Sequence, residues 1–336
     1  MYESYFQLRE KPFDIVPNPA YLYLSRTHKH ALRYLNYGLT ERLGFVLMTG
    51  EVGSGKTTLI RELIRTLSPE FTLARLFNTR VASDELIAMI NDDFGLDTAG
   101  KGKVPMLREL NAFLIAEYEQ GRRPVLIIDE AQNLTPELLE EIRMLSNLET
   151  DTAKLLQIML VGQPELGTSI ALPEMRQLRQ RISIMCHIRP LARRETEEYI
   201  LHRLEIAGNR SAISFLAGAF EAIHAATGGI PRQINTLCNF LLLTAYTEER
   251  SEVSAALVAD VAAELGLTEK AGQNVRKEQR PAAAPASGKK EPAGKVALLR
   301  ALGIVPQDND SAPSDIDGLA QVVPLNIRIP REDGLH

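Results

Sequence analysis

The residues from Gly50 to Thr58 have the types and the spacing of a phosphate-binding loop: a glycine, four residues, then glycine, lysine and threonine. Glycines let the backbone curl so that successive N–H groups point at one phosphate, and a helix that begins there adds the positive end of its dipole. Lys56 is expected to reach the β- and γ-phosphates of a nucleoside triphosphate, and Thr57 to place its hydroxyl on Mg²⁺. A glycine-rich turn followed by an unrelated lysine is the alternative. The residues expected to bind the nucleotide are Gly50, Glu51, Val52, Gly53, Ser54, Gly55, Lys56, Thr57 and Thr58.

Two adjacent carboxylates follow an apolar run in the stretch VLIIDE at 125–130. Asp129 is expected to hold the coordination shell of Mg²⁺, and Glu130 to orient and polarise the attacking water as a general base. Acidic pairs after a strand also occur as plain surface charge, which is the alternative. The guanine-reading pattern N-K-x-D does not occur downstream, so ATP is the expected nucleotide.

Two further polar residues could contact the γ-phosphate. Gln163 follows the apolar run at 158–162 and is expected to bond the attacking water or the γ-phosphate, although it could simply cap the next turn. Arg232 begins a helix after the turn GGIP, where the helix dipole disfavours a cation. A nearby polyphosphate would compensate that cost, so Arg232 is expected to sense the γ-phosphate from a lid.

Three arginines, Arg176, Arg179 and Arg181, precede the last apolar run of this region. One of them, with Arg181 preferred, is expected to reach the nucleotide of a neighbouring subunit and to stabilise the charge of the transition state. The alternative is a solvated basic helix end, which also suits the helix dipole.

These residues need a scaffold, and the pattern of apolar runs predicts an α/β fold. Short apolar runs alternate with stretches that have helical periodicity, which predicts a five-stranded parallel sheet sandwiched by helices. We expect a nucleotide-binding domain at 1–190, a small all-helical lid at 191–267, and a flexible linker and disordered tail at 268–336. Residues 296–305 could form one short helix or an incidental apolar patch. The expected strands lie at 44–50, 71–78, 124–131, 155–162 and 181–191.

The composition is that of an ordinary globular protein, with 45% hydrophobic and 24% charged residues in 336. A net charge of −5 argues against wholesale coating of nucleic acid. Cys186 and Cys238 suit a reducing compartment and form neither a metal site nor a disulfide framework. The N-terminus lacks a secretory signal and the longest apolar stretch is too short for a bilayer. We therefore expect no integral membrane segment, and a cytoplasmic protein that could lie peripherally at the inner membrane.

The order of these motifs resembles the AAA+ ATPases over roughly residues 1–267. Four stretches resemble the ExeA-type general secretion pathway ATPases within that superfamily: MYESYFQLREKPFDIVPNPAYLYLS, DEAQNL, VGQPEL and GGIPRQIN. A shorter branch, found beside PEP-CTERM/exosortase and exopolysaccharide loci, shares the same opening. The resemblance implies Gln163 as sensor 1, Arg181 or Arg179 as arginine finger, Arg232 as sensor 2, and an adenine pocket formed partly by residues 13–23.

The expected function is Mg²⁺-dependent ATP hydrolysis by a homo-oligomer, a hexamer or another ATP-dependent ring or filament. Lid movement would energise or regulate an exopolysaccharide, PEP-CTERM sorting or other secretion and envelope system. A DNA-binding ATPase that regulates transposition target choice, related to MuB, IstB and TnsC, is the alternative, and the acidic charge makes DNA the less favoured partner. A nucleotide switch that barely hydrolyses ATP is a third reading.

Overall fold

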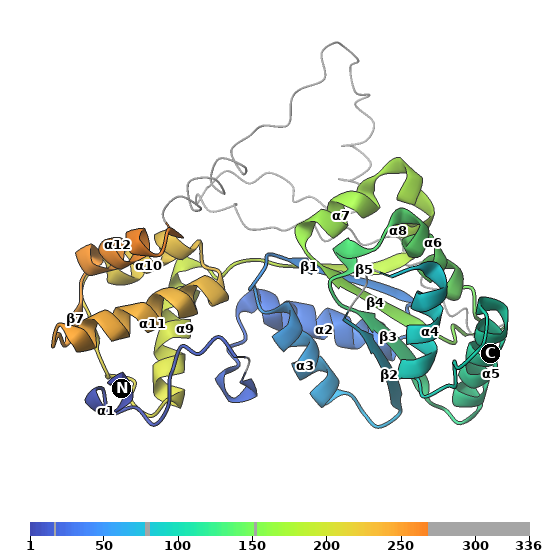
Figure 1. Cartoon of the computed structure of the whole chain (residues 1–336), viewed down its shortest axis with the longest axis horizontal. Helices are drawn as coiled ribbons and strands as arrows, with labels where there is room; N and C mark the ends of the chain where they lie inside the picture. The colour runs from blue at the N-terminus through green and yellow to red at the C-terminus, as the bar shows by residue number, and fades with distance from the viewer. Residues whose placement is uncertain (17, 78–80, 151–152, 268–336) are drawn as a thin grey trace, which may run out of the picture. The chain divides into compact units, whose positions relative to one another are not determined.

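The computed structural model describes residues 1–16, 18–77, 81–150 and 153–267 (Figure 1). The expected linker and tail at 268–336, including the short helix at 296–305, lie outside the described residues. The described residues all belong to one compact unit. The domain boundaries at 190 and 267 stay a prediction.

A five-stranded parallel sheet forms the centre of the nucleotide-binding region, in the order β2-β3-β4-β1-β5. This confirms the predicted α/β fold with a five-stranded parallel sheet. The strand order places β1 between β4 and β5, so the segment that follows β1 lies near the middle of the sheet's carboxyl edge. The strands are β1 (Phe45–Gly50), β2 (Phe71–Leu76), β3 (Arg123–Ile128), β4 (Gln157–Gly162) and β5 (Ile182–Ile188).

Helices cover both faces of this sheet because each central strand is apolar on both sides. Phe45 and Leu47 of β1 belong to the hydrophobic cluster on one face, and Val46 and Met48 to the cluster on the other. The first cluster also contains residues of α4 to α8, and the second contains residues of α2 and α3 (Figure 1). The flanking helices are α2 (Arg26–Thr40), α3 (Lys56–Thr66), α4 (Ser83–Asp93), α5 (Lys103–Glu119), η2 (Ala131–Asn133), α6 (Pro136–Leu145), α7 (Pro164–Ala171), η3 (Pro173–Met175) and α8 (Arg176–Arg181).

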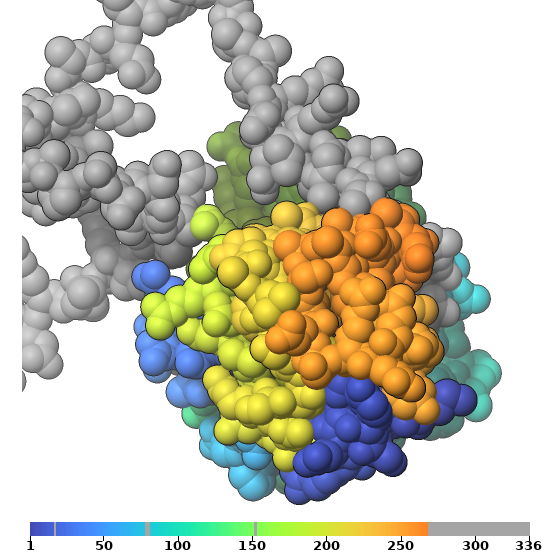
Figure 2. All heavy atoms as spheres, turned by 90° about the vertical axis from the view of Figure 1, so that its left-hand side faces the viewer, coloured from blue at the N-terminus to red at the C-terminus, as the bar shows by residue number. Residues whose placement is uncertain are grey.

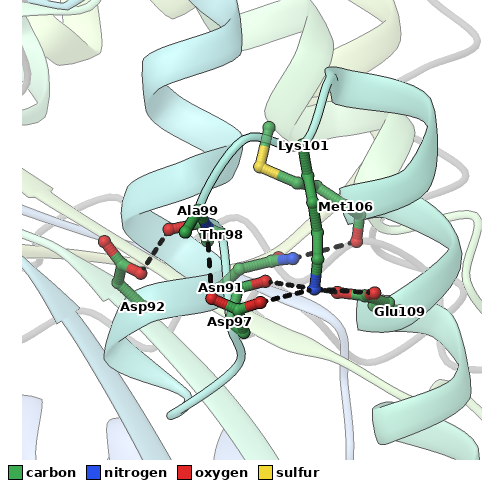
Figure 3. A network of polar contacts seen from close by, with 8 residues as sticks. All are labelled: Asn91, Asp92, Asp97, Thr98, Ala99, Lys101, Met106 and Glu109. Carbon is green, nitrogen blue, oxygen red and sulfur yellow. Dashed lines mark hydrogen bonds and ion pairs between the residues drawn. The ribbon is translucent and has the colours of Figure 1, made fainter.

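The connection between α4 and α5 is held by a polar network (Figure 3). The ammonium of Lys101 donates to the backbone carbonyl of Asp97 at 2.8 Å and to the carboxylate of Glu109 at 2.9 Å. Beneath it, the buried Asn91 amide donates to the carbonyl of Met106 at 2.9 Å. This network fixes how α5 returns to the sheet after α4, and it lies apart from the site described below.

The region after β5 is helical, and the N-terminal residues pack into it. Tyr2, Phe6 and Phe13 share one hydrophobic cluster with the lid helices. Figure 2 shows the N-terminal segment in blue beside the yellow and orange atoms of these helices. The region also contains a two-residue parallel strand pair. None of the helices in the described ranges combines the length and the apolar character that a membrane crossing requires. The remaining elements are α1 (Tyr2–Tyr5), η1 (Pro19–Tyr21), α9 (Arg193–Ile206), β6 (Ser214–Phe215), α10 (Ala219–Thr227), α11 (Pro231–Thr247), β7 (Glu252–Val253) and α12 (Ala255–Glu264).

Candidate active site

The glycine-rich loop joins the end of β1 to the start of α3. Gly55 precedes α3 with a φ of 98°, a left-handed conformation that side chains with a Cβ rarely adopt. Lys56 is the first residue of α3 and is 7% exposed. Its ammonium donates to the carbonyls of Gly50 at 2.8 Å and Glu51 at 3.0 Å. Burial lowers the pKa of Lys56, and the nearby carboxylates oppose that change. The loop therefore holds a buried cation at the positive end of a helix, a combination that favours a bound anion.

A pair of oxygen ligands lies beside this loop. The hydroxyl of Thr57 donates to Asp129 Oδ2 at 3.3 Å, and Asp129 Oδ1 accepts the backbone N–H of Glu130 at 2.9 Å. Magnesium prefers hard oxygen ligands and usually takes only one or two carboxylates besides phosphate and water. The chemistry of Thr57 and Asp129 therefore fits this ion.

Asp129→Asn should raise the melting temperature of the nucleotide-free protein. Burial raises the pKa of the Asp129 carboxyl, so ionisation is less favourable in the folded than in the unfolded chain, and the cost is present at neutral pH. Asparagine removes the charge and keeps an acceptor for the Glu130 N–H, so calorimetry at neutral pH without metal should show a gain of about 1–3 °C. The gain should shrink as the pH falls and the native carboxyl takes up its proton. A melting temperature at or below that of the wild type would contradict this ionisation cost.

Glu130 is held by two glutamine side chains. Its Oε2 accepts from the amide of Gln132 at 2.5 Å and from the amide of Gln163 at 3.3 Å. Gln132 also accepts the backbone N–H of Gln163 at 3.0 Å, so it joins the ends of β3 and β4. Glu130 itself has a φ of 52°, which is uncommon outside glycine and typical of strained functional positions. The structure thus brings Glu130 and Gln163 together, through a residue that the sequence analysis did not single out.

The lid approaches the loop at Arg232. The backbone N–H of Arg232 donates to the carbonyl of Gly53 at 3.2 Å. A Cβ on Gly53 would lie 2.5 Å from the Cβ of Arg232, so only glycine allows this approach. A cavity of about 420 Å³ lies beside the loop and the start of α11. Its lining includes residues 52–58, Glu130 and Arg232, as well as Tyr21, Tyr23 and Asp14 from the N-terminal segment.

Arg203 of α9 fixes the N-terminal wall of this cavity. The buried guanidinium donates to the backbone carbonyls of Pro12 and Asp14, and to the hydroxyl of Tyr199 at 2.9 Å. It also lies 4.7 Å from the ring centroid of Tyr21, a cation–π distance. The sequence does not predict this arrangement, because Arg203 lies in an ordinary helical pattern 191 residues from Pro12 and 189 residues from Asp14.

The arginines of α8 lie away from this cavity. The guanidinium of Arg181 donates to Ser146 Oγ at 2.9 Å, and that of Arg179 donates to the carbonyl of Ala171 at 3.2 Å. None of the three, Arg176 included, is among the described residues that line the cavity. Within one chain the structure therefore assembles the loop, the acidic pair, Gln163 and Arg232, but not the α8 arginines.

Comparisons with known proteins indicate the same class of nucleotide-binding protein as this geometry does. Residues 40–169 match the protein family described as "AAA domain". General secretion pathway protein A of Aeromonas hydrophila is 44% identical over 247 residues, which cover 73% of this chain and 45% of that protein. The chain therefore spans less than half the length of this relative.

Solved structures share the fold at low sequence identity. The Aeropyrum pernix ORC2 protein, in ADPNP-ADP complexes, has a TM-score of 0.54 at 19% identity and covers 76% of this chain and 71% of its own. Drosophila ORC bound to DNA has a TM-score of 0.58 at 15% identity, covering 89% and 83%. At these identities the likeness concerns the fold alone. The identity to the secretion protein, the matched domain and the assembled loop lead to one conclusion: the chain belongs to the AAA+ P-loop ATPases of the general secretion pathway protein A family.

Proposed function

We propose that this chain hydrolyses ATP in a Mg²⁺-dependent reaction and uses the cycle to move its lid within a homo-oligomer. The observation that carries the proposal is the position of Glu130. Glu130 is the residue after Asp129, which together with Thr57 suits Mg²⁺. Its carboxylate accepts a hydrogen bond from Gln163 at the end of the adjacent strand.

Each residue has a distinct role in the proposed reaction. Lys56 would exchange its two loop carbonyls for the β- and γ-phosphate oxygens of ATP. Glu130 would accept a proton from water as the water oxygen attacks the γ-phosphorus and the bond to the bridging oxygen of ADP breaks. Gln163 would orient that water through its amide. Magnesium, held by Thr57 and Asp129, would neutralise charge that develops on the phosphates.

Arg232 would link the γ-phosphate to the lid. The start of α11 already touches the loop through the Arg232 N–H, so loss of the γ-phosphate would remove one of the attractions that hold lid and loop together. Movement of α9 to α12 would follow hydrolysis and act on a partner.

We infer from the relative's name that the partner belongs to a secretion or envelope-assembly system. Within that group we propose an exopolysaccharide or PEP-CTERM sorting system, since the ATPases found beside such loci share the opening stretch of this chain. A place at the cytoplasmic side of the inner membrane would suit such a partner. The net charge of −5 disfavours the DNA-binding alternative.

Phosphate release from purified protein tests the proposal. We expect ATP turnover with Mg²⁺ and its loss when a chelator removes the metal, because the phosphates then lack a counter-charge. The assay should be run alone, with anionic vesicles and with duplex DNA. Turnover that survives chelation would contradict the Mg²⁺ requirement, and stimulation by DNA alone would favour the alternative function.

A further inference from the structure

His28, near the start of α2, contacts the glycine-rich loop and is among the residues that line the cavity. It is 5% exposed, and its Nε2 lies 3.0 Å from the carbonyl oxygen of Ser54. Its Nδ1 lies 2.7 Å from the hydroxyl oxygen of Ser25, the residue that caps α2. A carbonyl can only accept, so Nε2 carries the hydrogen and donates to Ser54, while the Ser25 hydroxyl can donate to Nδ1. Burial lowers the pKa of His28, which favours this neutral form of the ring.

The ring also explains one feature of the loop. A Cβ added to Gly55 would lie 3.1 Å from His28 Nε2, and the residue has a φ of +98°. Gly55 therefore suits this position in two ways: other residues rarely adopt its φ, and a Cβ would press against the imidazole. The histidine and the loop fit together as one packed unit.

Because the peptide bond is planar, a contact with its carbonyl also sets the direction of its N–H. In a trans peptide the C=O of one residue and the N–H of the next point in opposite directions. When His28 holds the Ser54 carbonyl, it also directs the Gly55 N–H to the other side of the Ser54–Gly55 peptide. In a phosphate-binding loop such N–H groups donate to the phosphate oxygens.

The lid holds the helix that carries His28. The carboxylate of Glu195, in the first turn of α9, accepts the backbone N–H of Arg26 at 2.8 Å through Oε1. Its Oε2 accepts the N–H of Ala192 at 3.0 Å, so one side chain joins the first turns of α2 and α9. Glu195 is thus connected to the loop only through α2 and His28, whereas Arg232 of α11 contacts the loop directly.

We propose that His28 is a positioning residue that aims the Ser54–Gly55 peptide at the phosphates of ATP. The inference rests on the proposed nucleotide site and adds a residue that acts through the loop backbone. Ser25 orients the ring, and Glu195 ties the start of its helix to the lid.

A matched pair of substitutions tests this role. The amide nitrogen of His28→Gln can take the place of Nε2, whereas that of His28→Asn sits near Nδ1 and does not reach Ser54. We expect the dissociation constant for ATP, measured with a fluorescent analogue, to rise roughly tenfold in His28→Asn and no more than about threefold in His28→Gln. In turnover assays KM should rise with kcat nearly unchanged, because phosphate binding is lost in ground and transition states alike. His30→Gln, an exposed position on the same helix, should match the wild type.

The outcomes separate this inference from the proposed function. Equal ATP affinities in folded His28→Asn and His28→Gln proteins would overturn the role of His28, and a wild-type protein that binds no ATP would overturn the site itself. Should His28→Asn show no folding transition in thermal denaturation, Ser25→Ala provides the second variant. It removes the partner of Nδ1 together with the side-chain cap of α2, so its melting temperature is measured beside its affinity for ATP. It should raise the dissociation constant about threefold, and an unchanged value would count against the proposal.

Discussion

Glu130→Gln should keep ATP bound and nearly stop its hydrolysis. The amide retains an oxygen that can accept from Gln132 and Gln163, so the site should keep its shape, but it cannot take a proton from the attacking water. General-base catalysis typically contributes 10²–10⁴-fold, so we expect kcat to fall by about that factor. The dissociation constant for ATP should change by less than about threefold, because Glu130 acts on water rather than on the phosphates. Single-turnover phosphate release and equilibrium binding measure the two quantities.

Glu165→Gln is the matched control. Glu165 lies in the first turn of α7, close enough to Lys56 to influence its pKa, and it carries the same charge as Glu130. It should keep wild-type kcat, because a general change of charge near the loop does not remove the base. Wild-type turnover in Glu130→Gln would show that another group accepts the proton, and loss of ATP binding would show that Glu130 holds the substrate instead.

The sheet and the loop could be predicted because their signals are local. Strands buried on both faces appear as unbroken apolar runs, as at Val125 to Ile128, and the loop's glycines and lysine are consecutive in sequence. The carboxyl ends of parallel strands meet at one edge, so the approach of Asp129 to Thr57 followed from the topology alone.

The residues that the sequence analysis missed depend on contacts between distant segments. Gln132 looks like part of the acidic motif, and its bonds to Glu130 and Gln163 exist only once β3 and β4 are neighbours. His28 is one of several polar residues in a helix whose buried face becomes visible only when α2 packs beside the loop. The small β6–β7 pair is too short for a periodic pattern to develop.

Arg181→Ala should lower kcat by about 10³-fold or more with little effect on ATP affinity, which is the range measured for arginine fingers. Arg181 contacts Ser146 and is not among the described residues that line its own cavity. A catalytic Arg181 must then act on a second subunit, so its loss removes charge stabilisation from the transition state and leaves ATP binding intact. Arg179→Ala is the matched control on the same short helix, and steady-state kinetics would separate kcat from KM.

Mixing two inactive proteins distinguishes action in trans from a structural role. Arg181→Ala supplies an intact Glu130, and Glu130→Gln supplies an intact Arg181. In randomly mixed oligomers, half of the subunits are Arg181→Ala and carry the base Glu130. Half of those have a Glu130→Gln neighbour that supplies Arg181, so roughly a quarter of wild-type activity should return. A mixture that stays inactive although the subunits co-assemble, or Arg181→Ala with full activity, would contradict the assignment. If Arg179→Ala is inactive and regains activity when it is mixed with Glu130→Gln, Arg179 is the arginine finger instead. A finger is identified by complementation between subunits and not by its position on α8.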